Sequence, residues 1–212
     1  MEKFKPFVIS GASGAGKTTL VDRMISKFPE LERVITTTTR DPRLRDNGEM
    51  ERNGIDYHFF DRAQFVQDVG AGRFLEWAEI YGNMYGNHVS EIRRIRGINK
   101  SALFIVDIQG LIALKRNLDS CATIFIYPPN IAILEERLLQ RGEKMEAIPI
   151  RMREAYSEIV TGREHSQYHL INSDLSTAER EMAEIIAGEL EGIGASKYLH
   201  PPSLELYARP IK

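Results

Sequence analysis

Residues 11–18 constrain the fold of this chain more than any other segment, because they fit the pattern G-x-x-x-x-G-K-[S/T]. The segment consists of Gly11, Ala12, Ser13, Gly14, Ala15, Gly16, Lys17 and Thr18. An apolar run, 7–9, precedes it, and a segment with helical spacing, 19–25, follows it. A strand, a glycine-rich turn and a helix in this order are the context of a phosphate-binding loop. A plain Gly/Ser turn before an amphipathic helix is the alternative, and it leaves the complete motif unexplained.

The chemistry of this phosphate-binding loop follows from its residues. Glycines let the backbone bend so that successive N–H groups point inward, and the helix that follows adds the positive end of its dipole. Lys17 can reach terminal phosphates, and the hydroxyl of Thr18 can bind Mg²⁺. We therefore expect a bound nucleotide.

Composition excludes several other classes of protein. The net charge of −2 gives no electrostatic case for a nucleic-acid binder. The single cysteine, Cys121, lies in an apolar run, so we expect a core thiol and no internal disulfide. No apolar run approaches the ~18 residues of a membrane span, and the first residues do not resemble a signal peptide. These observations predict a cytoplasmic protein without membrane contact.

Strand-like and helix-like segments alternate along the chain, which predicts an α/β fold with a mostly parallel sheet and helices on both faces. Strands are expected at 7–10, 34–38, 102–107, 123–127 and 168–171, and helices at 17–27, 109–116, 130–140, 146–164 and 176–190. Asn130 is expected to cap one helix, and Ser176 or Thr177 the last one. No element is assigned to the tail, 191–212.

Residues 36–98 differ from this alternation. Short strands at 57–60 and 74–81, helices at 61–70 and 89–98, and a long polar loop predict a mixed α/β insertion that closes over a second substrate. A turn at 82–83 is expected to lead into the second helix.

Charged residues in and near the insertion are candidates for binding. Arg40 and Arg43 open the polar loop, and guanidinium groups match phosphate oxygens in a bidentate manner. Glu76 stands among large apolar residues, and Asp107 follows a buried strand at its carboxyl end. Arg137 and Arg153 are interpreted as partners in ion pairs on helix surfaces.

From about residue 7 to 190 the chain resembles the guanylate kinase family. The ordered motifs that carry the resemblance are residues 11–18, T-T-R-D-P-R at 38–43, G-I-D-Y at 54–57, F-L-E-W at 74–77, G-N-M-Y-G at 82–86 and D-I-Q-G at 107–110. The 38–43 and 82–86 motifs are specific to that family.

The resemblance implies a role for each matching residue. ATP would be bound by residues 11–18, Thr19 and Asn172, with Mg²⁺ on Thr18. GMP would be bound by Thr36, Arg40, Arg43, Tyr57, Glu76, Tyr85, Asn87 and Asp107, with Glu76 and Asp107 reading the guanine. Catalysis would depend on Lys17, Arg43, Arg141 and Arg151, the last two from an arginine-bearing helical lid. ATP and GMP would be the small-molecule partners of a monomer or homodimer.

The resemblance also implies one domain, 1–190, of the P-loop NTPase type. Its core would be 1–35, 99–135 and 167–190, the GMP-binding insertion 36–98 and the lid 136–166. The expected reaction moves the γ-phosphoryl group of ATP to GMP, and to dGMP. The alternatives are a kinase for another or a modified nucleoside monophosphate and a catalytically inactive binding module. Departures from the family pattern are Thr36 for serine, Asn87 for a small hydroxyl residue, Ile105 for an acid, and a longer loop after Arg43.

Overall fold

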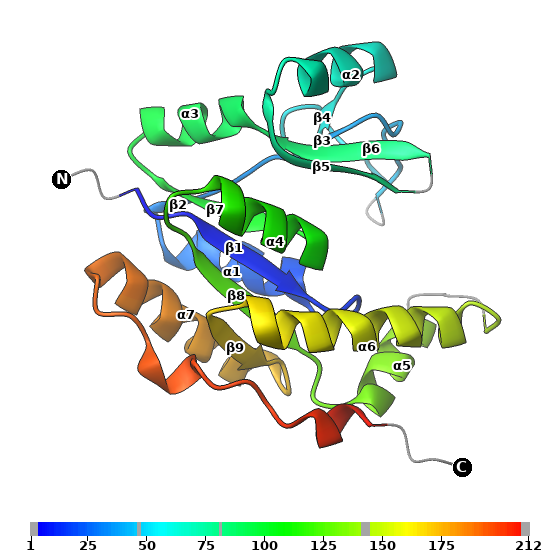
Figure 1. Cartoon of the computed structure of the whole chain (residues 1–212), viewed down its shortest axis with the longest axis vertical. Coiled ribbons are helices and arrows are strands. Elements are labelled where there is room, and N and C mark those ends of the chain that lie inside the picture. The colour runs from blue at the N-terminus through cyan, green and yellow to red at the C-terminus, as the bar shows by residue number, and fades with distance from the viewer. Residues whose placement is uncertain (1–3, 46–47, 81, 141–144, 209–212) are drawn as a thin grey trace.

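A five-stranded parallel sheet forms the centre of the protein. The computed structural model describes residues 4–45, 48–80, 82–140 and 145–208 (Figure 1). The strands are β1 (Phe7–Gly11), β2 (Leu31–Arg33), β7 (Ser101–Ile105), β8 (Ala122–Tyr127) and β9 (Tyr168–Ile171). Their order is β2-β7-β1-β8-β9, and every neighbouring pair is parallel. The predicted parallel sheet is confirmed.

Helices cover both faces of this sheet, which explains why β1 and β8 are buried along their whole length. The helices are α1 (Lys17–Lys27), α3 (Val89–Gly97), α4 (Ile108–Asn117), α5 (Ile131–Gln140), α6 (Ile148–His165) and α7 (Leu175–Glu191). Helix α1 packs against α7, and α4 packs against α6. Connections between parallel strands are right-handed. Helix α1 leads from β1 toward the β2 edge and α4 leads from β7 toward the β9 edge, so α1 and α4 lie on opposite faces of the sheet, each with its partner helix.

A second, smaller sheet lies beyond the first one (Figure 1). It consists of β3 (Thr37–Thr38), β4 (His58–Phe59), β5 (Phe74–Ile80) and β6 (Asn83–His88) in the order β4-β3-β6-β5. The β3–β4 pair is parallel, and β6 is antiparallel to β3 and β5. Helix α2 (Arg62–Gly70) joins this sheet through a 4.3 Å ring stack of Phe65 on Phe74. The prediction of a mixed region here is confirmed.

Two of the predicted elements are wrong. The single strand at 34–38 is replaced by β2 and β3, which belong to different sheets, and the connecting residues are held by Leu103 and Glu91. Residues 83–88 form β6 where a turn and helix entry were expected. A run of β-branched residues does not specify which strand it pairs with. Gly86 made a strand at 83–88 hard to predict, because glycine is unfavourable in strands; in β6 its missing Cβ allows Trp77 to approach closely.

Helix caps and the tail add detail that the sequence left open. Asp174 caps α7 by accepting the N–H of Thr177 at 2.8 Å, so the expected cap at Ser176 or Thr177 is wrong. Asn130 accepts the N–H of Ile133 at 2.9 Å, as predicted. The tail forms two 3₁₀ helices, η1 (Ser196–Tyr198) and η2 (Leu204–Tyr207).

Tyr207 anchors the tail to the core. It is 1% exposed, its ring lies 6.0 Å from that of Tyr127, and its hydroxyl donates to the carbonyl of Pro128 at 3.0 Å. Cys121 is partly buried and packs against the core, in line with the expected core thiol. Within the described ranges, no helix combines the length and the apolar character needed to cross a membrane.

Candidate active site

The phosphate-binding loop leaves the carboxyl end of β1, the central strand, and ends where α1 begins at Lys17. Gly16 adopts a left-handed conformation at φ 90°, which turns the chain into the helix. The Lys17 Nζ lies 2.5 Å from the carbonyl of Gly11 and 3.2 Å from that of Ala12, so the side chain folds back over the loop. Thr18 and Thr19 are exposed in the first turn of α1. The first turn of α1 follows the loop directly, and the N-terminus of a helix is the arrangement in which backbone N–H groups bind anions.

Asn172 supports the loop from the end of β9. Its side-chain amide is buried and donates to the carbonyl of Ala15 at 2.8 Å. A Cβ on Gly16 would lie 2.4 Å from the same nitrogen, so this glycine is required by packing as well as by its φ angle. The structure therefore joins Asn172 to the phosphate-binding loop, 157 residues away along the chain.

A cavity of about 340 Å³ lies beside this junction. Its lining includes Gly14, Gly16, Thr19, Arg137 and Asn172. Arg137 donates to the backbone carbonyl of Asn172 at 3.2 Å, so its interpretation as a surface ion-pair partner is wrong. The sequence did not predict this contact of Arg137, because only the tertiary fold brings α5 beside the end of β9.

Glu158 of α6 also contacts the phosphate-binding loop. Its carboxylate accepts the N–H of Ser13 at 3.3 Å. Burial raises the pKa of Glu158, and the nearby charge of Lys17 opposes this shift. Sequence reasoning missed Glu158, because nothing local distinguishes it from the other acids along α6.

A second cavity, of about 190 Å³, lies between the small sheet and the carboxyl end of β7. Most of the residues expected to bind GMP line it, namely Thr36, Tyr57, Glu76, Tyr85, Asn87 and Asp107. Glu76 comes from β5 and Asp107 from the end of β7, so the two carboxylates approach from different sheets. We refer to this space as the acidic cavity.

Glu76 and Asn87 are cross-strand partners in the β5–β6 pair. The Asn87 Nδ2 donates to Oε1 of Glu76 at 2.6 Å, and its Oδ1 accepts from the hydroxyl of Thr36 at 3.4 Å. Burial raises the pKa of Glu76 to about 7; the Asn87 hydrogen bond opposes this shift, and the charge of Asp107 adds to it. Asp107 accepts the N–H of Gly110 at 2.8 Å and so caps α4.

The two arginines of the polar loop have different environments. Arg40 is 7% exposed, and its guanidinium lies 5.2 Å from the ring centre of Tyr57. The rings of Tyr57 and Tyr85 are 6.4 Å apart, which places Arg40 at the border of the acidic cavity. Arg43 is exposed, and its side chain has no hydrogen-bond or ion-pair partner among the described residues.

The lid arginines are only partly accounted for. Arg151 lies near the start of α6 and donates to Glu154 at 3.2 Å, and it lines neither of the two cavities. Arg141 lies outside the described residues.

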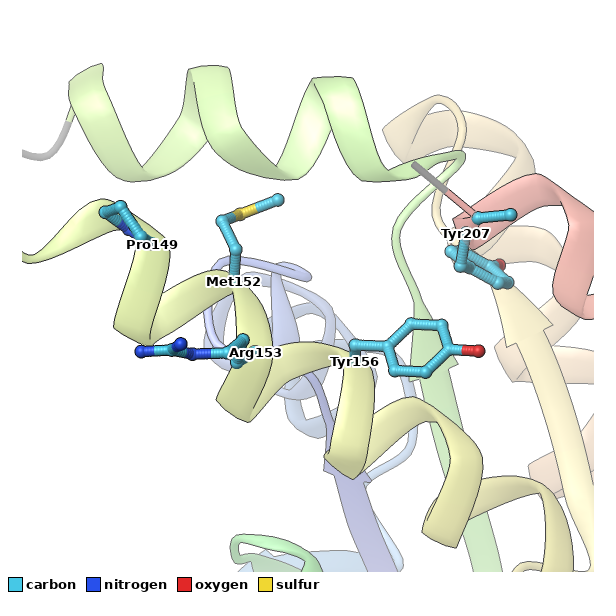
Figure 2. Close-up of a pocket in the computed structure, with 6 residues that line it drawn as sticks. Pro149, Met152, Arg153, Tyr156 and Tyr207 are labelled. Carbon is cyan, nitrogen blue, oxygen red and sulfur yellow. The ribbon is translucent and has the colours of Figure 1, made fainter. Parts of the chain in front are cut away.

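Another cavity, of about 320 Å³, is separate from this site. Figure 2 shows Pro149, Met152 and Tyr156 on α6 facing it, with Tyr207 of the tail at one end. Its lining is mainly apolar and includes neither the phosphate-binding loop nor a carboxylate.

A phosphate-binding loop after the central strand of a parallel sheet, with an acidic cavity in an added sheet, defines the class as P-loop nucleotide kinases. A sequence model described as Guanylate kinase matches residues 3–189. The chain belongs to the guanylate kinase family.

Individual relatives agree with this assignment. The chain is 39% identical to a guanylate kinase of Myxococcus xanthus over 86% of this chain and 85% of that protein. It is 35% identical to a guanylate kinase of Schizosaccharomyces pombe over 86% of this chain and 90% of that protein. The fold is also similar to a crystal structure of guanylate kinase from Anaplasma phagocytophilum, with a TM-score of 0.65 and 24% identity over 90% of this chain and 88% of that one.

Proposed function

We propose that this protein transfers the γ-phosphoryl group of ATP to GMP, and also to dGMP, to give ADP and the nucleoside diphosphate. The observation that carries the proposal is the acidic cavity, where Glu76 and Asp107 face one space in a protein with an intact phosphate-binding loop. Membership of the guanylate kinase family supports the same reaction.

The acidic cavity suits guanine by its hydrogen-bonding pattern. Guanine presents N1–H and an exocyclic N2–H group, and ionised carboxylates accept both. Adenine lacks this pair of donors and would leave buried acceptors unpaired. Mismatches of this kind can discriminate between substrates by several orders of magnitude. Glu76 and Asp107 are the residues that we assign to this recognition, with Thr36 and Asn87 beside them.

Charge neutralisation accounts for the transfer itself. The attacking group is an ionised phosphate, so no general base is required. Lys17 and the phosphate-binding loop hold the ATP phosphates, while Arg40, Arg43, Tyr57 and Tyr85 hold the phosphate of GMP. Arg43 and the lid arginines, Arg141 and Arg151, spread the charge on the transferred group. Closure of the insertion, 36–98, and the lid, 136–166, over the core excludes water.

Magnesium fits the donor set of this site. Within the ranges that the structure describes, no group of three or more His, Cys, Asp or Glu side chains forms a metal cage. The exposed hydroxyl of Thr18 at the start of α1 would share Mg²⁺ with phosphate oxygens and water, as is usual for this ion. When bound, Mg²⁺ supplies charge neutralisation of the ATP phosphates. We place the protein in the cytoplasm, as a monomer or homodimer that needs no nucleic acid or membrane.

A coupled assay of ADP release with GMP, dGMP, AMP, CMP and UMP tests the proposal. We expect turnover with GMP and dGMP and a loss of more than about a hundredfold with the other three. The control is Lys17→Ala, which should abolish turnover while the variant still folds. A preference for any base other than guanine would contradict the proposal, and so would absence of turnover in the wild type.

A further inference from the structure

The described parts of the polar loop after Arg43, 43–45 and 48–51, pair with each other as the arms of a short hairpin. Leu44 and Met50 form an antiparallel bridge, and Arg45 accepts a hydrogen bond from Gly48 and donates one to Glu49. In this register Glu51 lies opposite Arg43, and its N–H donates to the Arg43 carbonyl at 2.9 Å. The hairpin therefore brings an acid to an arginine eight residues earlier in the chain.

The side chain of Glu51 connects the two phosphate-site arginines. Its Oε2 accepts the backbone N–H of Arg43 at 2.8 Å and lies 2.9 Å from Nη2 of Arg40. Its Oε1 accepts from the same Arg40 nitrogen at 3.0 Å. The Glu51 side chain is 17% exposed and that of Arg40 is 8% exposed, so this ion pair is largely shielded from water.

Other contacts complete the fixation of Arg40. Its Nη1 donates to the carbonyl of Asp41 at 2.7 Å, and its guanidinium stands over the ring of Tyr57. Burial opposes the charge of Arg40, but the hydrogen bond and the charge of Glu51 outweigh burial and raise the pKa of Arg40. A guanidinium has five N–H donors, so those not engaged by Glu51 and Asp41 remain for a ligand.

We infer that Glu51 is a positioning residue of the monophosphate site, which holds the Arg40 side chain and the Arg43 backbone in the geometry that receives the phosphate of GMP. This inference rests on the proposed function. A free arginine side chain loses rotamer entropy when it becomes fixed, and binding is weaker when that freedom is lost only on contact with the ligand. Glu51 removes the freedom of Arg40 in advance.

The negative charge of Glu51 would also repel a phosphate bound beside it, which weakens binding. If repulsion were the larger effect, Glu51 would weaken the binding of GMP, and its removal would strengthen it. The two effects therefore predict changes of opposite sign, which makes the variant Glu51→Gln decisive. The glutamine keeps the size of the side chain and removes its charge.

Calorimetric titration with GMP and with guanosine, which lacks the phosphate, separates positioning from a general structural role. For Glu51→Gln we expect about tenfold weaker binding of GMP or more, and guanosine binding within about twofold of the wild type. Steady-state kinetics should show a higher KM for GMP, with the KM for ATP unchanged. The shorter acid in Glu51→Asp should restore part of the affinity. Glu49→Gln, in the same hairpin, is the matched control and should change neither affinity.

Three outcomes would overturn the inference: unchanged GMP binding, tighter GMP binding, or equal weakening for GMP and guanosine in Glu51→Gln. If that variant does not fold, Glu51→Asp decides, because positioning requires it to weaken GMP binding and leave guanosine binding unchanged. A wild type that fails to bind GMP contradicts the proposed function itself. If the wild type binds GMP and Glu51→Gln binds it with the same affinity, only the role of Glu51 is contradicted.

Discussion

The side-chain nitrogen of Asn87 lies 2.6 Å from Oε1 of Glu76, across the β5–β6 pair. This contact connects Asn87, one of the residues that depart from the family pattern, with the carboxylate that we assign to guanine recognition. Only the ionised carboxylate of Glu76 accepts hydrogen bonds with both oxygens, and burial raises its pKa to about 7. The donor on Asn87 favours the ionised form and therefore bears directly on activity near neutral pH.

Replacing Asn87 with alanine should move the acid limb of activity to higher pH. The variant loses the hydrogen bond that holds down the pKa of Glu76, so a larger fraction of the carboxyl is protonated at pH 7. We expect kcat/KM for GMP to fall several-fold at that pH and to recover toward the wild-type value in more alkaline buffer. A pH profile of kcat/KM measures this shift. An acid limb that stays in place or moves to lower pH would show that Asn87 does not control Glu76.

Glu76→Gln should impair the use of GMP far more than the use of ATP. The amide of glutamine replaces one acceptor oxygen with an N–H donor, which cannot accept a hydrogen bond from the N–H groups of guanine. We expect kcat/KM for GMP to fall by about a hundredfold or more, with the KM for ATP within about twofold. Steady-state kinetics with each substrate varied in turn provides the measurement. Equal losses for both nucleotides would mean that Glu76 has only a structural role.

The same variant should be more stable than the wild type in alkaline buffer without nucleotide. The pKa of Glu76 is raised from 4.5 to about 7, so the folded state binds more protons than the unfolded state between these values. The wild type therefore loses stability as the pH rises through this window, and a neutral glutamine does not. Melting temperatures at pH 5 and pH 8 test the sign. The advantage of Glu76→Gln should be larger at pH 8, and a larger advantage at pH 5 would contradict the raised pKa.

Glu91→Gln should destabilise the fold where the chain passes between the two sheets. The Glu91 side chain is 3% exposed and contacts His58, Arg94 and the N–H of Ile35. Burial opposes its ionisation, but these hydrogen bonds outweigh burial and lower the pKa of Glu91 to about 2. We expect a loss of about 2 kcal/mol in the free energy of unfolding at pH 7.

The pH dependence gives a second check on Glu91. A lowered pKa contributes stability that is present above 4.5 and is lost as the pH falls toward 2. The difference between wild type and variant should therefore shrink in acid, as measured by urea unfolding at several pH values. The control is Glu79→Gln, which breaks the exposed ion pair with Arg62 and should have little effect. A difference that grows in acid would refute the assignment.

Gly162→Ala should destabilise the packing of α6 against the parallel sheet. A Cβ at this position would lie 2.4 Å from the ring of Phe125, which is 0% exposed. Relieving the clash requires a shift of the helix or the ring, and we expect a loss of about 1–3 kcal/mol in unfolding free energy. Gly97→Ala, at the end of α3, is the matched control because nothing lies within 4 Å of its added Cβ. Equal melting temperatures for the two variants would rule out close packing at Gly162.

Local patterns were sufficient for the class of fold and for half of the site. The phosphate-binding loop was identified from residues 11–18, because its chemistry depends on backbone conformation and near neighbours. Alternating strand and helix periods predicted the parallel sheet for the same reason. The family motifs assigned Glu76 and Asp107 to one ligand, and the structure lines a single cavity with both.

Pairings between distant segments were decided only by the tertiary structure. The sequence alone could not divide residues 31–38 between two sheets, because strand propensity does not specify a partner. It also could not place Arg137 beside Asn172 or Glu158 beside Ser13, since each contact joins elements that only the crossovers of the fold bring together. Even Glu51 reaches Arg40 through the register of a hairpin, which hydrogen bonds set and composition does not. Sequence by itself therefore determined which chemical groups this protein has, and the tertiary structure decided which of them touch, because packing acts on distances in space.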